Sequence, residues 1–90
     1  MRSIHAVVTG RVQGVGFRYT TRNMARRLGL AGWVRNRADG SVELRAQGEP
    51  AAVADLESFL AEGPSGAKVN SVTVTEVDPD PGLSAFELRL

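Results

Sequence analysis

The segment Gly10-Arg11-Val12-Gln13-Gly14-Val15-Gly16-Phe17-Arg18 combines glycines, backbone amides and an arginine in a pattern that suits anion binding. It joins a stretch with strand periodicity to a stretch with helix periodicity. Glycine adopts positive backbone dihedral angles at little steric cost, so a turn here can direct several N–H groups to one point. The N-terminus of the following helix adds the positive end of the helix dipole. We therefore predict a cradle for an oxyanion, with phosphate as the best candidate.

Arg18 is the first candidate for a functional side chain. It lies in the first turn of the predicted helix, where the dipole disfavours a cation. An anion bound between its guanidinium and the backbone amides would remove this conflict. The alternative is a solvated surface arginine without a role, since lone surface charges are common.

Asn36 is the second candidate for a functional side chain, because asparagine is disfavoured in strands. Period-two alternation places it on the same face as Val34 and opposite to Trp33 and Arg35. On a buried face its carboxamide needs partners, because an unpaired amide costs roughly 1–3 kcal/mol. It would then point towards the cradle and bind water or substrate. A bulge that turns Asn36 outward before the next hairpin is equally compatible with the sequence.

The sequence provides no evident base, nucleophile or metal site beside these groups. It has no cysteine and a single histidine, His5, which we expect on the open face of a sheet. A cradle, one arginine and one amide supply only orientation and electrostatic stabilisation. They suffice where the leaving group is already a stable anion, such as a carboxylate whose conjugate acid has a pKa of about 4. An acyl phosphate meets this condition, and its phosphate can accept the proton of the attacking water.

Hydrophobic periodicity predicts the elements that position these residues. We expect strands at 3–12, 31–38, 41–47, 70–78 and 86–90, and helices at 18–28 and 50–62. Asp39-Gly40 is a strong signal for a hairpin between two of these strands. Alternation along the strands indicates an antiparallel sheet that helices cover on one side only. The order β-α-β-β-α-β predicts an α+β, ferredoxin-like sandwich with two helices on one face, plus a short C-terminal strand.

Composition limits the function classes. Ninety residues are enough for one domain, which we expect to span 1–90. A net charge of +1 argues against a dedicated nucleic-acid binder. An RNA-binding domain of the same element order would carry stacking aromatics on its third strand, and residues 41–47 have none. No apolar run approaches the ~20 residues of a membrane span, and no secretory signal is apparent, so we expect a cytoplasmic protein.

These motifs resemble the acylphosphatase family, small enzymes that hydrolyse acyl phosphates. Gly10 to Arg18 is similar to the first signature of the family. Gly32-Trp33-Val34-Arg35-Asn36, followed by Asp39-Gly40 and by Gly48, is similar to the second. The likeness covers essentially the whole chain, including the ending Phe86-x-Leu88-Arg89.

The resemblance implies a role for each matching residue. Arg18 would bind the substrate phosphate together with the backbone amides of Gln13, Gly14, Val15, Gly16 and Phe17. Asn36 would hold the attacking water, and Arg89 would pack near the loop. The resemblance also implies a carboxylate and inorganic phosphate as products, no metal or cofactor, and a monomeric cytosolic protein. The alternative is a phosphate-binding or regulatory module of the same fold that lacks catalytic activity.

Overall fold

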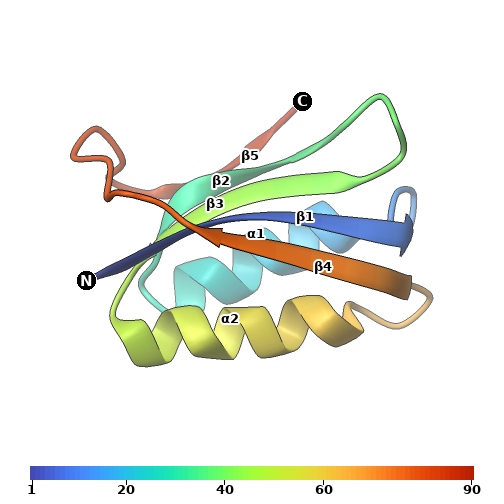
Figure 1. Ribbon diagram of the computed structural model, residues 1–90. Coiled ribbons are helices and arrows are strands. Elements are labelled where there is room, and N and C mark those ends of the chain that lie inside the picture. The colour runs from blue at the N-terminus through green and yellow to red at the C-terminus, as the bar shows by residue number, and fades with distance from the viewer.

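A five-stranded sheet lies over two helices that both cover the same face (Figure 1). The computed structural model describes all residues, 1–90. The strands are β1 (Arg2–Arg11), β2 (Ala31–Asn36), β3 (Val42–Gly48), β4 (Lys68–Glu76) and β5 (Phe86–Arg89), and the helices are α1 (Phe17–Arg27) and α2 (Pro50–Glu62). The α+β, ferredoxin-like architecture expected from the sequence is confirmed. Neither helix combines the length and apolarity needed to cross a membrane.

The order of strands across the sheet is β4-β1-β3-β2-β5. The first four strands pair antiparallel, as expected, whereas β5 pairs parallel to β2, which makes the sheet mixed. The connection between β4 and β5 crosses from one edge of the sheet to the other at the same end (Figure 1). Because the chain then runs back along the sheet, β5 takes the direction of β2. Gln47 secures this crossing, since its side chain donates to Asp80 O and accepts from Asp80 N.

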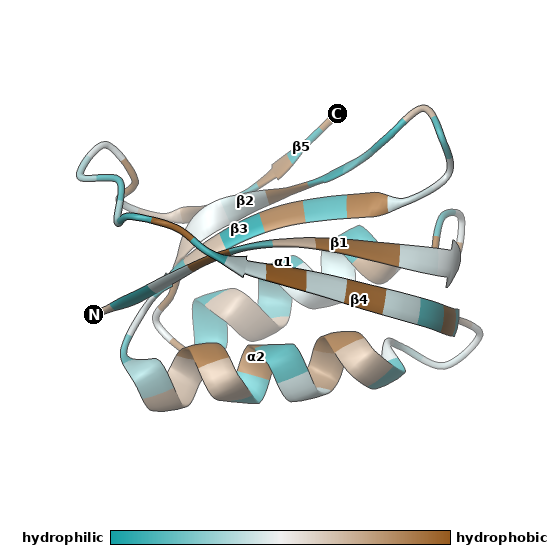
Figure 2. Cartoon of the chain, viewed as in Figure 1, coloured by the Kyte–Doolittle hydropathy of each residue, from teal (hydrophilic) through white to brown (hydrophobic).

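The core lies between the sheet and the helices. Alternate residues of β1 and β3 point into it, and Figure 2 shows hydrophobic and hydrophilic positions alternating along β3 and β4. The fully buried side chains include Ile4, Val8, Val34, Val42 and Leu44 from the sheet and Phe17, Val53, Leu56 and Leu60 from the helices. Phe59 is only partly buried and packs against Phe17 with ring centroids 5.9 Å apart.

The β2–β3 hairpin closes through residues 38–40 rather than through Asp39-Gly40 alone. Arg37 N donates to Ser41 O at 2.8 Å, and Gly40 takes a positive φ of 93°. A three-residue loop that ends in such a glycine is a common alternative to the two-residue turn. It pairs Val34 with Leu44, so both apolar side chains share the core face. The shorter loop would shift the register by one residue and place a charged residue opposite Val34.

On the open face of the sheet, His5 and Arg35 both contact Glu43. His5 Nε2 lies 2.6 Å from Glu43 Oε2, and Arg35 Nε donates to Oε1 at 2.6 Å. Partial burial raises the pKa of Glu43, but the hydrogen bonds from His5 and Arg35 outweigh it and hold that pKa below its ordinary value. The Glu43 carboxylate therefore connects β1, β2 and β3.

We expect Glu43→Gln to destabilise the fold by about 1 kcal/mol at pH 7, because the amide loses the charge that strengthens both hydrogen bonds. A folded-state pKa below the unfolded value of 4.5 stabilises the fold above that pH, and this contribution is lost as the pH falls through the folded pKa. Urea unfolding should show that the free energies of unfolding of Glu43→Gln and wild type differ less at pH 3 than at pH 7. Glu87→Gln, at an exposed position of β5, is the control, and an equal loss for Glu43→Gln at both pH values would contradict the assignment.

Candidate active site

The turn between β1 and α1 has the backbone conformation that its glycines suggested. Gly14 and Gly16 have φ angles of 74° and 79°, and Gly16 is the N-cap of α1. A Cβ atom added to either would meet nothing within 4 Å. Conformation, and not lack of space, therefore requires glycine at both positions.

The backbone N–H groups from Gln13 to Tyr19 donate no hydrogen bond within the protein. The first backbone donor of the helix is Thr20, whose N–H bonds to Gly16 O at 3.0 Å. No side chain caps this helix end, and its first turn contains no acidic residue. The segment thus presents a continuous run of unpaired donors beside the positive end of the helix dipole, which is the arrangement that binds oxyanions.

Asn36 is the last residue of β2 and pairs with Val42 in regular register, so the strand has no bulge there. Its side chain lies on the core-facing side with Val34, and its Oδ1 atom is buried without a hydrogen-bond partner. A buried acceptor left unpaired is costly, and such atoms are rare. The outward-turned alternative for Asn36 is therefore excluded.

The turn, Arg18 and Asn36 meet at one cavity of about 160 Å³. Its lining consists of Val12, Gly14, Gly16, Phe17, Arg18, Tyr19 and Asn36. Five residues of the predicted site, Gly14, Gly16, Phe17, Arg18 and Asn36, thus line one cavity, whereas Gln13 and Val15 are not among its lining residues.

Gln13 contributes a contact that sequence reasoning missed. Its Nε2 atom donates to Arg37 O at 2.7 Å and to Ser41 O at 2.9 Å. These two carbonyls flank the three-residue loop that follows Asn36. The Gln13 side chain therefore ties the glycine turn to the hairpin that carries Asn36. Nothing in the sequence marks this contact, because it depends on the three-dimensional placement of the hairpin.

Arg18 is tied to the C-terminal strand. Its Nη1 atom donates to Arg89 O at 3.0 Å, so the backbone at the end of β5 contacts Arg18. The Arg89 guanidinium itself stacks 4.9 Å from the centroid of the Trp33 ring. A guanidinium has five N–H donors, so Arg18 keeps the others for a ligand.

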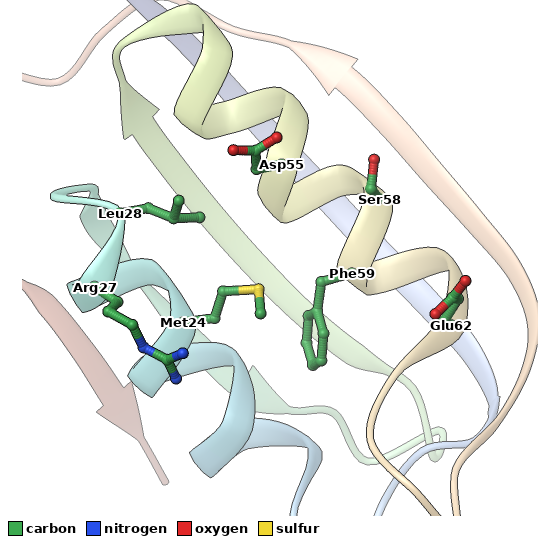
Figure 3. A pocket seen from close by; sticks show the side chains of 7 residues that line it. All are labelled: Met24, Arg27, Leu28, Asp55, Ser58, Phe59 and Glu62. Atoms are coloured by element: carbon green, nitrogen blue, oxygen red, sulfur yellow. The ribbon is translucent and has the colours of Figure 1, made fainter.

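A larger cavity of about 490 Å³ lies between α1 and α2 (Figure 3). Its lining consists of Met24, Arg27, Leu28, Asp55, Ser58, Phe59 and Glu62. Figure 3 shows the Phe59 ring between the two helices, with Met24 on the facing helix. None of the site residues expected from the sequence lies in this groove, so the smaller cavity is the candidate active site.

A family model described as acylphosphatase matches residues 4–88. The chain belongs to the acylphosphatase family. An acylphosphatase of Bifidobacterium longum is 59% identical over 86 residues, which cover 94% of this chain and 89% of that protein. One from Anaeromyxobacter dehalogenans is 52% identical over 83 residues, covering 92% and 89%. The crystal structure of acylphosphatase from Bacillus subtilis superimposes with a TM-score of 0.95 at 39% identity over 100% of both chains.

The cavity of this acylphosphatase-family chain combines three kinds of group. Unpaired backbone N–H donors and the Arg18 guanidinium can hold the oxygens of an anion. The Asn36 carboxamide oxygen can accept a hydrogen bond from a small donor such as water. No carboxylate or imidazole is among the residues that line the cavity.

Proposed function

We propose that this protein is an acylphosphatase, which hydrolyses acyl phosphates to a carboxylate and inorganic phosphate. The observation that carries the proposal is one small cavity that Arg18, Asn36 and the glycine turn line together. The backbone N–H groups of the turn are unpaired there, and the Asn36 oxygen is buried without a partner. Membership of the acylphosphatase family, over nearly the whole chain, supports the same activity.

The phosphoryl group binds in the glycine turn. Its oxygens accept hydrogen bonds from the backbone amides of Gln13 to Phe17 and from Arg18. These donors stand ready before the substrate arrives, since no group of the protein occupies them. Pre-positioned donors stabilise the charge that spreads over the phosphoryl oxygens in the transition state.

Asn36 holds the attacking water. Its Oδ1 accepts a hydrogen bond from the water, whose lone pair then faces phosphorus. A bond forms between the water oxygen and phosphorus while the bond from phosphorus to the carboxyl oxygen breaks, and the carboxylate leaves with the electron pair. The proton of the water passes to a phosphate oxygen. The leaving carboxylate needs no general acid, because its conjugate acid has a pKa of about 4.

The Gln13 side chain positions Asn36 relative to the phosphoryl group. The two hydrogen bonds to Arg37 O and Ser41 O connect the turn, which holds phosphate, to the hairpin, which holds the water. In-line attack requires the reacting atoms to approach within about 3–3.5 Å, so a small shift between these two segments slows the reaction.

The proposal extends to how the enzyme works in the cell. Residues 1–90 act as one domain, as a cytoplasmic monomer without metal or cofactor, on small acyl phosphates and with no nucleic-acid or membrane partner. The cytoplasmic location is supported by a sequence without cysteine, which requires no oxidising compartment to fold.

The roles of Arg18 and Asn36 are separable by kinetics. Wild-type protein should hydrolyse benzoyl phosphate in the presence of EDTA. Arg18→Ala should lower kcat/KM by about 10²- to 10³-fold and weaken competitive inhibition by inorganic phosphate, because charge-stabilising donors are lost. Asn36→Ala should lower kcat by about 10²-fold and retain phosphate inhibition, because only the water loses its partner. Arg18→Lys keeps the charge but not the planar fork of donors, and serves as the conservative control.

p-Nitrophenyl phosphate, whose phenoxide leaving group has a conjugate acid weaker than a carboxylic acid, should be a poor substrate of the same protein. A wild-type protein that binds phosphate but turns over no acyl phosphate would contradict the proposal and favour the non-catalytic phosphate-binding module.

The role of Gln13 is tested by a double-mutant cycle. Gln13→Ala should lower kcat by about tenfold with little change in inhibition by phosphate. Gln13→Glu is the isosteric control and should be equally impaired, because a carboxylate cannot donate to two carbonyls. In an Asn36→Ala background, Gln13→Ala should have almost no further effect, since the water is already unpositioned. Fully additive losses would show that Gln13 acts independently of Asn36.

A further inference from the structure

Tyr19 is the only large hydrophobic side chain that is exposed among residues 2–89, with 55% of its surface accessible. It also lines the cavity that contains Arg18 and Asn36. Packing of the core does not account for an aromatic ring at this place, because the ring lies outside the core.

The position of Tyr19 in α1 directs its ring to the outer rim of the cavity. Helical side chains lean towards the helix N-terminus, which here is the end that faces the cavity. Tyr19 follows the buried Phe17 by two residues, or about 200° around the helix axis, and so projects away from the core. The guanidinium of Arg22 lies 5.1 Å from the ring centroid, where a cation–π contact holds one face of the ring. Because Tyr19 is largely exposed, the rest of its ring surface is accessible to a ligand.

Tyr19 is the exposed aromatic residue of a cavity of about 160 Å³, whose other aromatic lining residue, Phe17, is buried. In-line displacement places the leaving group opposite to the attacking water. Asn36, which holds that water, ends β2, whereas Tyr19 lies in the first turn of α1 at another part of the cavity lining.

We propose that Tyr19 forms a subsite for the acyl group, which favours acyl phosphates with an aromatic or broad apolar acyl group over acetyl phosphate. This inference rests on the proposed acylphosphatase function. The acyl group stacks on the open surface of the Tyr19 ring, and offset aromatic pairs of this kind add attraction beyond the burial of surface. Acetyl offers only a methyl group and gains almost nothing from the ring.

The test compares benzoyl phosphate and acetyl phosphate as substrates of wild type, Tyr19→Ala and Tyr19→Phe. Tyr19→Ala should lower the ratio of kcat/KM for benzoyl phosphate to kcat/KM for acetyl phosphate by about fivefold, mainly through the KM for benzoyl phosphate. Tyr19→Phe retains the ring without its hydroxyl and should keep the wild-type ratio. Inhibition by inorganic phosphate should be the same in all three proteins, because the cradle is intact.

Equal changes for both substrates in Tyr19→Ala, or no change for either, would overturn the subsite while leaving the enzyme in place. Loss of benzoyl selectivity in Tyr19→Phe would also overturn it, because stacking requires only the ring. A wild-type protein that hydrolyses neither substrate would overturn the proposed function itself, and the inference with it. The urea midpoints of unfolding of the variants should match that of wild type, as for other exposed positions.

Discussion

The candidate active site depends on backbone N–H groups of residues 13–19 that stay unpaired and fixed in position. Unpaired N–H groups are costly when water is excluded, and a free turn would relax to satisfy them. The fold prevents this by anchoring both ends of the segment. Val12 is buried at the end of β1, and Phe17 is buried at the start of α1. Between these two anchors the glycines accept backbone angles that other residues adopt only with strain.

Three contacts connect this segment to the neighbouring elements of the fold. Gln13 ties it to the β2–β3 hairpin, and Arg18 ties it to β5 through Arg89 O. Phe17 packs at the end of α2, where a Cβ on Gly63 would come within 2.7 Å of its ring. The last strand, the hairpin and the second helix are therefore all coupled to the same turn, although each is distant from it in sequence.

The sequence predicted the features that depend on local physics. The glycine turn, both helices and the strand alternation follow from dihedral preferences and hydrophobic period. The period alone left the inward face of Asn36 open, because a bulge was equally compatible with the sequence. The three-residue hairpin loop was missed, because Asp39-Gly40 suits a tight turn locally, whereas the pairing of Val34 with Leu44 decided the register. The parallel direction of β5 could not be predicted, because it depends on where the chain crosses the sheet. The Gln13 contacts could not be predicted either, because they depend on where the β2–β3 hairpin lies beside the turn.

The central claim is that phosphate binds to the amides of the glycine turn together with Arg18. A titration of ¹⁵N-labelled protein with inorganic phosphate, followed by two-dimensional amide NMR, tests it most directly. The account predicts saturable shifts concentrated on the amide resonances of Gln13 to Tyr19, which disappear in Arg18→Ala. Shifts confined to other surfaces, or saturable binding that leaves the turn unperturbed, would contradict it.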